Sequence, residues 1–203
     1  MVTLTALESE LLALAGSVPD PELPVLTLHE LGVVRAVHVR DADSVEVELT
    51  PTYTGCPAIE AMSVDIERVL HDHGVREVTV RTVLAPAWST DDITDEGRRK
   101  LREFGIAPPR ATTPTAAGPV AVGLGPTRTL DATAGPGTPA ATALTGAAAE
   151  GAEAEPVGPV EPVRCPHCGS ADTELLSRFS STACKALRRC VDCREPFDHF
   201  KEL

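Results

Sequence analysis

A stretch of 57 residues, 107–163, is the feature that most constrains what this chain can fold into. It holds 10 of the 18 prolines, 8 of the 15 glycines, 15 alanines and no aromatic residue. Such a segment cannot bury enough apolar surface to offset the conformational entropy lost on ordering. We therefore predict a disordered linker that divides the chain into an N-terminal domain, residues 1–106, and a C-terminal module, residues 164–203.

The first half of the N-terminal domain contains one helical pattern and two strand patterns. Leucines recur at helical spacing between residues 4 and 14, and Gly16 suits the end of that helix. Residues 33–39 and 44–50 each alternate apolar and polar side chains, and turn-forming residues lie between them. This order predicts a β-hairpin after the first helix.

The second half of the domain returns to helical spacing from Pro57 onwards. Residues 75–84 have the composition of a third strand, and Thr94 suits the N-cap of a short last helix. The predicted fold is therefore α+β: a small three-stranded sheet with two to three helices packed on it.

The C-terminal module contains two Cys-x2-Cys pairs, Cys165 with Cys168 and Cys190 with Cys193, separated by 21 residues. Each pair turns tightly enough for two thiolates to face one ion, and two pairs complete a tetrahedron. Forty residues are too few to be held by a hydrophobic core alone, so metal binding would supply folding energy. We predict a zinc ribbon with a structural ion, and iron is the alternative because four thiolates suit both metals.

A fifth cysteine of this module, Cys184, belongs to neither pair. One interpretation is a small apolar residue on the strand that leads to Cys190. The other is an auxiliary thiol, a spare ligand used when a metal is handed over. The sequence leaves both interpretations open.

The remaining cysteine, Cys56, lies between Gly55 and Pro57 in the sequence TYTGCPAIEAM. Proline suits the first position of a helix, which would place Cys56 at the N-cap. There the free N–H groups and the helix dipole would lower the pKa of the thiol. The alternative is a buried and inert cysteine in a strand–helix turn.

A metal-binding role for Cys56 needs further ligands, because one thiol cannot hold a metal tightly. Asp20 and Glu22, in the proline-bounded sequence PDPELP, have the required chemistry. The sequence does not place them near Cys56, and such carboxylates are otherwise turn and capping residues. Cys56, Asp20 and Glu22 are thus candidates for transient binding of iron or an iron–sulfur cluster.

The formal net charge of −12 argues against nucleic-acid binding, because an acidic chain repels phosphate backbones. No apolar run approaches the roughly 18 residues of a membrane span, and the N-terminus lacks the early basic residues of a secretory signal. We therefore expect a cytoplasmic protein whose partners are proteins and metals, and whose cysteines are metal ligands or reactive thiols.

No catalytic constellation is recognisable in the sequence. The six histidines show no spacing with a carboxylate that would orient a general base, and no glycine-rich phosphate loop follows a predicted strand. We therefore expect a protein that is not itself an enzyme.

Four segments together resemble the PaaD-type family, whose members are accessory subunits of phenylacetyl-CoA epoxidase. They are PDPELPVLTLHELGVVRAV, TPTYTGCPAIEAM, PAWSTDDITDEGRRKLREFGIAPP and the cysteine-containing run CPHCGS…FSSTACKALRRC…CREPFDHFK. The resemblance covers about residues 1–110 and 164–203. The N-terminal part is also similar to the wider iron–sulfur assembly-factor family that includes SufT, which shares Asp20-Pro21-Glu22 and a cysteine, here Cys56, before a helix.

The resemblance implies an accessory subunit of a multi-component enzyme of aerobic phenylacetate degradation. In that complex a di-iron oxygenase, a structural partner and a flavin/iron–sulfur reductase are separate chains, and the PaaD-type chain helps to mature or load a metal centre. A family cysteine after the final Phe-Lys is missing here, which favours Cys165, Cys168, Cys190 and Cys193 as the complete ribbon set.

Two other functions remain open from the sequence. The chain could be a structural adaptor between epoxidase subunits, with no metal-transfer chemistry. It could also be a thiol redox enzyme in which Cys56 attacks and Cys184 resolves, although no second cysteine lies near Cys56 in the sequence.

Overall fold

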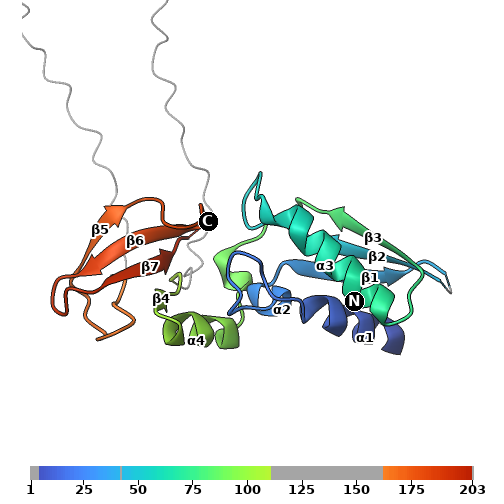
Figure 1. Cartoon of the computed structure of the whole chain (residues 1–203), viewed down its shortest axis with the longest axis horizontal. Helices are drawn as coiled ribbons and strands as arrows, with labels where there is room; N and C mark the ends of the chain where they lie inside the picture. Colours follow the sequence, from blue (N-terminus) through green and yellow to red (C-terminus); the bar gives the residue numbers. More distant parts are fainter. Residues whose placement is uncertain (1–4, 42, 111–161, 203) are drawn as a thin grey trace, which may run out of the picture. The chain divides into compact units, whose positions relative to one another are not determined.

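The structure, a computed structural model, describes residues 5–41, 43–110 and 162–202 (Figure 1). Most of the predicted linker, residues 111–161, therefore lies outside the described residues. The described part folds as α+β, with two small sheets and few helices, which confirms the predicted class.

The first sheet has the order β1-β2-β3, formed by Val34–Val39, Ser44–Leu49 and Glu77–Thr82. β1 and β2 form the predicted antiparallel hairpin, with Val37 opposite Val47. β2 and β3 are parallel, because the chain crosses over between them through a helix. On β2 buried residues alternate with half-buried ones, so one face of this strand carries the core.

Two helices pack on this sheet. α1 spans Ala6–Gly16 and contacts β1, whereas α3 spans Ala58–Asp72 and contacts β3. The two helices also touch each other, so they cover the same face of the sheet (Figure 1). Large, fully buried side chains of this core include Leu11, Leu26, Leu28, Leu31, Leu49, Met62, Ile66, Leu70 and Leu101.

The N-terminal segment also contains a last helix that the sequence predicts and two short elements that it does not. α4 spans Asp95–Glu103, and its N-cap is Thr94, whose hydroxyl accepts a hydrogen bond from the Gly97 N–H at 3.1 Å. The one-turn helix α2, Leu28–Leu31, and the 3-10 turn η1, Thr90–Asp92, are too short to produce a readable period.

The second sheet has the order β4-β7-β6-β5, and one of its strands comes from the N-terminal segment. β5, Thr173–Ser177, β6, Lys185–Cys190, and β7, Pro196–Phe200, form the antiparallel ribbon. β4, Ile106–Ala107, adds to its edge and runs parallel to β7. Ile106, the last residue of the predicted N-terminal domain, and Ala107, the first of the predicted linker, therefore share one sheet with the ribbon.

The ribbon also contributes side chains to the N-terminal core. Phe200 is fully buried, and its ring centroid lies 6.1 Å from that of Trp88. Trp88 in turn donates a hydrogen bond from its indole nitrogen to the Leu31 carbonyl at 2.9 Å. Cys184 belongs to the same buried cluster. Among the described residues, no helix is long and apolar enough to cross a membrane.

Candidate metal centres

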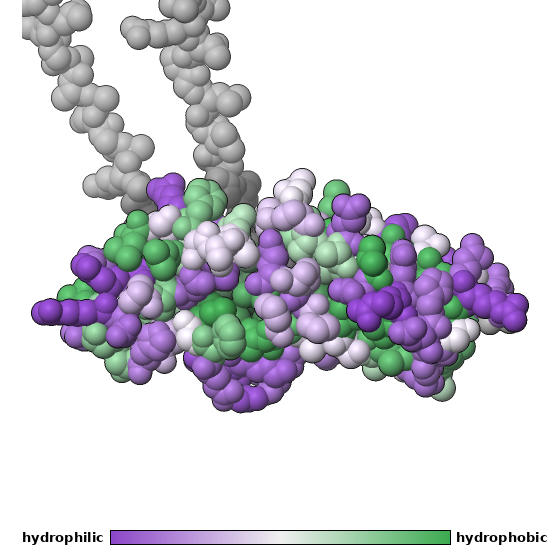
Figure 2. Space-filling view, viewed as in Figure 1, coloured by the Kyte–Doolittle hydropathy of each residue, from purple (hydrophilic) through white to green (hydrophobic). Residues whose placement is uncertain are grey.

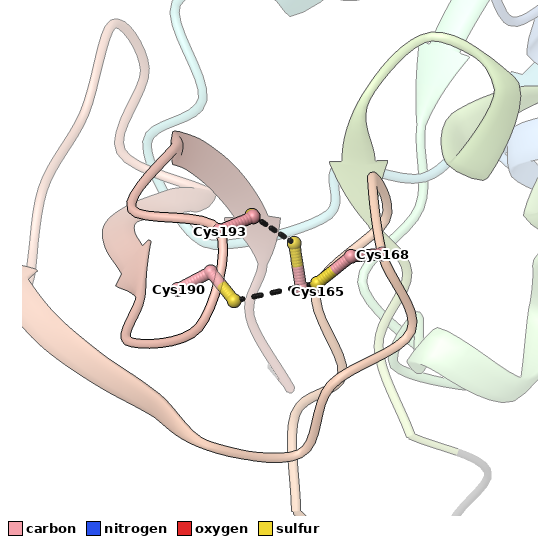
Figure 3. A group of neighbouring side chains, drawn as sticks. All are labelled: Cys165, Cys168, Cys190 and Cys193. Carbon is pink, nitrogen blue, oxygen red and sulfur yellow. Dashed lines mark hydrogen bonds between the residues drawn. The ribbon is translucent and has the colours of Figure 1, made fainter.

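The four ribbon cysteines converge on one point, as the sequence predicts they should (Figure 3). Their sulfur atoms all lie within 4.8 Å of one another. The Cys165 and Cys193 sulfurs are 3.7 Å apart, and those of Cys168 and Cys190 are 3.5 Å apart. A tetrahedron of thiolates around zinc, with bonds of about 2.3 Å, has edges of about 3.8 Å. The arrangement therefore fits a four-thiolate metal ion.

Each Cys-x2-Cys pair lies in a turn of the same construction. The N–H of Cys165 donates to the Ser170 carbonyl at 2.8 Å, and the N–H of Cys190 donates to the Glu195 carbonyl at 3.0 Å. The residue after the second cysteine takes a left-handed conformation in both turns: Gly169 has φ +77° and Arg194 has φ +65°. The second turn thus repeats the first with a residue that adopts this conformation less readily.

Backbone N–H groups point at the sulfurs and favour the charged thiolate that a metal requires. The N–H of Cys193 is the main cause that lowers the pKa of Cys190 to about 7. The N–H of Ser170 acts in the same sense on Cys168, but the hydrogen bond with Cys190 and burial raise the pKa of Cys168 overall. The N–H of Glu195 lowers the pKa of Cys193, but burial and the neighbouring thiols likewise raise it to about 12. Backbone donors at three of the four sulfurs suit a bound metal ion, because they hold the thiolates in place.

Cys56 lies one position further from its helix than the sequence predicts. α3 begins at Ala58, and its N-cap is Pro57, so Cys56 precedes the cap. Gly55 makes this entry possible because it takes φ +87°. The N–H of Cys56 donates to the Tyr53 carbonyl at 3.2 Å, which folds the loop into a turn. Cys56 is half-buried at the end of this turn.

The predicted lowering of the Cys56 pKa is wrong: its pKa is raised above the ordinary thiol value. Burial is the largest cause, and the charges of Glu22 and Asp20 add to it. The N–H of Ala58 and the side chain of Tyr53 oppose the change without outweighing it. The backbone N–H at the start of α3 does stabilise a thiolate, but desolvation and two nearby carboxylates outweigh it and raise the pKa of Cys56.

The same interactions show that Asp20 and Glu22 lie within electrostatic reach of Cys56, which the sequence leaves undecided. Asp20 is 3% exposed, and its Oδ1 accepts hydrogen bonds from the Glu22 N–H at 2.9 Å and the Leu23 N–H at 2.6 Å. It is therefore a turn-capping residue as well as a neighbour of the thiol. Burial raises the pKa of both carboxyls.

Cys184 joins this group from the ribbon. It is 4% exposed, and its sulfur lies 3.0 Å from the Thr182 hydroxyl. Burial raises its pKa, and Glu22 and Asp20 act on it in the same direction. The carboxylates that influence Cys56 thus also influence Cys184. These thiols and carboxylates do not converge as closely as the ribbon sulfurs, which among the described residues form the set within 4.8 Å.

Two neighbours of this second group could not be identified from the sequence. Tyr53 interacts with the side chain of Cys56. Burial raises the pKa of Tyr53, and the charges of Cys56 and Cys184 act in the same direction. Lys185 is 5% exposed and forms an ion pair with Asp198 at 3.1 Å, and its charge partly opposes the burial that raises the pKa of Asp20 and Glu22. Tyr53 comes from the loop that holds Cys56, whereas Lys185 joins the group only because the ribbon packs on the N-terminal domain, which no local pattern indicates.

Comparisons with known families agree with the two halves of the chain. The family model described as PaaD zinc beta ribbon domain matches residues 149–201. The family model described as iron-sulfur cluster assembly protein matches residues 8–84. The first match contains all four ribbon cysteines, and the second contains Asp20, Glu22 and Cys56.

Individual relatives extend this agreement to almost the whole chain. A protein of Escherichia coli (strain K12), described as a putative 1,2-phenylacetyl-CoA epoxidase subunit (the one lettered D), is 38% identical over 192 residues, 95% of this chain and 91% of that protein. The "Fe-S protein maturation auxiliary factor" of Porphyromonas gingivalis (strain ATCC BAA-308 / W83) is 30% identical over 95 residues, 46% of this chain and 90% of that protein.

Two solved structures also match the chain in part. A domain of unknown function, DUF59, from Bacillus anthracis is 30% identical, with a TM-score of 0.44, and covers 47% of this chain and 92% of its own. A conserved hypothetical protein from Thermotoga maritima is 28% identical, with a TM-score of 0.40, and covers 50% and 98%.

Proposed function

The chain belongs to the PaaD-type family of phenylacetyl-CoA epoxidase subunits, and from that premise we propose that it is an accessory subunit that loads a partner's metal centre. Its cargo would be iron or an iron–sulfur cluster. The recipient would be a metal-containing subunit of the epoxidase, namely the oxygenase subunit or the reductase subunit that the resemblance implies. The protein would act in the cytoplasm and would not catalyse the epoxidation itself.

One observation carries this proposal: Cys56 lies within electrostatic reach of the buried Asp20 and of Glu22, in a segment that matches an iron–sulfur assembly family. A sulfur and two carboxylates are ligands that ferrous iron accepts. The raised pKa of the Cys56 thiol means that a metal bound there would have to displace the thiol proton. A site of this kind binds its cargo conditionally, which suits transfer.

The ribbon site would have a different task. Its four sulfurs fit zinc, and its backbone donors hold the thiolates in place. Cys165, Cys168, Cys190 and Cys193 would therefore bind a structural zinc ion that keeps β5, β6 and β7 folded. No open coordination position is left for chemistry once four thiolates are bound.

The test compares wild-type protein with Cys56→Ser, co-expressed with the epoxidase subunits and purified without oxygen. We expect the variant to fold and to keep its zinc, while the partner subunit contains less iron or sulfide. Thr54→Ala is the matched control, because it changes an exposed side chain of the same loop and removes no sulfur. A partner with full metal content beside the Cys56 variant would refute the loading function.

An adaptor between epoxidase subunits is the second candidate, and a surface feature favours it. A groove of about 350 Å³ is lined in part by Val25, Phe104, Leu187 and Phe197. Phe104 is 68% exposed, and Figure 2 shows hydrophobic residues gathered near the middle of this face. An adaptor would co-purify stably with its partners and would tolerate Cys56→Ser without loss of partner metal.

A further inference from the structure

A cavity of about 540 Å³ lies between helix α4, the residues that follow β4 and the first Cys-x2-Cys turn of the ribbon. Its volume is within the range of small-molecule pockets, about 300–1,000 Å³. The charged side chains that line it are Asp95, Arg98, Arg102, Arg110 and Arg164. Four of these five side chains are cations, in a chain whose formal net charge is −12. The cavity therefore concentrates positive charge and favours an anion.

The fold brings these arginines together from three segments. Arg98 and Arg102 are four residues apart on α4, so they lie on the same side of that helix. Arg110 follows β4, which pairs with β7. Arg164 directly precedes Cys165, the first of the four converging ribbon cysteines. No local sequence pattern joins these segments, because they meet only when the second sheet forms.

Two of the four arginines are held by the protein itself. The Arg98 guanidinium donates hydrogen bonds to the carbonyl oxygens of Pro109 and Thr90, both at 2.6 Å. Arg110 donates from its Nε to a carboxylate oxygen of Glu202 at 2.8 Å. These contacts fix α4 and the segment after β4, so the walls of the cavity are set before any ligand binds.

Arg102 and Arg164 are the arginines that remain available for a ligand. Both are exposed. Among the described residues, the side chain of Arg102 has no hydrogen bond or ion pair, and that of Arg164 has one hydrogen bond, to the Gly169 carbonyl at 3.3 Å. A guanidinium matches a phosphate group with two parallel hydrogen bonds. Two such groups from different elements suit a ligand that carries two linked phosphates.

Much of the remaining lining is apolar and rigid. These residues are Ala107, Pro108, Pro109, Pro162, Val163 and Pro166. Proline has a fixed φ, so a proline-rich wall loses little conformational freedom when a ligand covers it. An apolar wall beside a few placed polar groups is the usual construction of a site for an organic molecule. A bare phosphate ion would leave this wall uncovered, whereas a flat ring system attached to phosphates would cover it.

We propose that this cavity is a binding site for a nucleoside diphosphate, with the phosphates on Arg102 and Arg164 and the base on the proline-rich wall. Arginine also stacks on flat aromatic rings, which suits a base beside the same residues. The site contains neither Cys56 nor the carboxylates near it, so the inference goes beyond the proposed function and does not depend on it.

The test measures binding of adenosine diphosphate (ADP) to the full, zinc-loaded chain by isothermal titration calorimetry. We expect one ADP per chain. Adenosine lacks the phosphates and pyrophosphate lacks the base, so each should bind at least about tenfold more weakly than ADP. ADP that binds no more tightly than adenosine, or no more tightly than pyrophosphate, would overturn the proposal.

Arg102→Ala and Arg164→Ala should each weaken ADP binding at least about tenfold, since each removes charge-assisted hydrogen bonds to phosphate. Arg99→Ala is the matched control on α4, because Arg99 pairs with Glu96 and Glu103 and does not line the cavity. This control should change ADP binding less than about twofold. A loss as large as that of Arg102→Ala would mean that ADP follows the general charge of the helix, and the site would be overturned.

Arg189→Ala is the matched control on the ribbon. Arg189 directly precedes Cys190 as Arg164 precedes Cys165, but it pairs with Glu174 and does not line the cavity. This variant should keep the wild-type affinity for ADP. Zinc content and circular dichroism, measured on every variant, report whether the ribbon is intact.

The competing role for Arg164 is to balance the charge of the four ribbon thiolates. In that case Arg164→Ala would lose zinc and the wild-type protein would not bind ADP, which would overturn the inference. If a variant does not fold, the wild-type comparison of ADP with adenosine and pyrophosphate decides. Cys56→Ser should bind ADP as the wild type does, so the loading function and this site can fail independently.

Discussion

The two groups of cysteines in this chain differ in the neighbouring groups that shift the pKa of their thiols. In the ribbon, backbone N–H groups favour thiolates and the pKa of Cys190 falls to about 7, whereas burial and the neighbouring thiols raise the pKa of Cys193 to about 12 and also raise that of Cys168. Around Cys56 and Cys184, burial and two carboxylates raise the thiol pKa values. Backbone donors beside the converging sulfurs suit metal binding in the ribbon, whereas burial and carboxylates favour the protonated thiols of Cys56 and Cys184. The residue type is the same, so the surroundings decide the chemistry.

The largest expected effect comes from removing one ribbon sulfur by Cys190→Ser. Structural zinc contributes apparent binding free energies of about 10–16 kcal/mol in zinc-finger peptides. A ribbon of this size has too little folding stability to remain folded without that contribution. We expect loss of zinc and unfolding of β5–β7, measured by metal analysis and amide hydrogen exchange.

The same variant reports on the N-terminal core through its single tryptophan. Because Phe200 of the ribbon packs on Trp88, the Trp88 fluorescence should shift to longer wavelength when the ribbon unfolds. Cys56→Ser should leave both zinc and fluorescence unchanged, which is the contrast between the two cysteine groups. Equal zinc loss in the two variants would break that contrast.

The next effect tests the packing that brings Cys184 to the second group. Phe200→Ala removes a fully buried aromatic side chain and should lower the free energy of unfolding by about 3–5 kcal/mol. Urea unfolding followed by Trp88 fluorescence measures it. Phe179→Ala is the control, since Phe179 is 65% exposed and its ring interaction with the Lys201 ammonium is worth less than about 1 kcal/mol. Equal losses would mean that Phe200 does not anchor the ribbon.

Acid should weaken the ribbon side of the comparison through His199. Burial is the main cause that lowers the pKa of His199 from 6.5 to about 4, and Arg188 and Arg110 act in the same direction, while Glu202 opposes them. Between these pH values the unfolded chain binds a proton that the folded chain does not. The free energy of unfolding therefore falls as the pH drops from about 6.5 to 4, by about 3 kcal/mol.

His199→Gln isolates this contribution, because glutamine does not titrate. The variant should lose stability less steeply than wild type between pH 6.5 and 4 in denaturant unfolding. Identical pH profiles for the two proteins would show that His199 is not the group responsible.

The smallest effect distinguishes the two metal-binding turns from each other. Arg194→Gly relieves a left-handed conformation at a non-glycine residue and should stabilise the ribbon by about 1 kcal/mol. Gly169→Ala should do the reverse by a similar amount, since a methyl group there meets nothing within 4 Å and only the φ of +77° opposes it. Zinc competition with a chelator measures both, and opposite signs are the expected result.

Much of the fold was predictable because it depends on local patterns. The hairpin of β1 and β2, the helix α3 and the Thr94 cap follow from alternation, helical spacing and a single side-chain hydrogen bond. The convergence of the four ribbon sulfurs was predictable for the same reason, since two short turns of fixed spacing bring each pair together. The boundaries 1–106, 107–163 and 164–203 stay a prediction.

What could not be predicted depends on contacts across the long intervening segment. β4 is two residues long and has no period of its own, so only its pairing with β7 defines it as a strand. The raised pKa of Cys56 follows from burial and from two carboxylates 36 and 34 positions earlier, whereas the local helix entrance argues for the opposite. Local sequence describes the donors near a thiol, and it says little about how much water the fold removes.

The sequence by itself therefore determined the α+β class, the four-cysteine ribbon and the family, because these rest on spacing and on long contiguous motifs. The tertiary structure decided which residues lie near Cys56. Asp20 and Glu22 come near Cys56 through the fold of the N-terminal domain. Cys184 comes within the influence of the same carboxylates because strand pairing of β4 with β7 and packing of Phe200 on Trp88 dock the ribbon on the N-terminal core. Docking through side chains far apart in the chain leaves no local pattern to read.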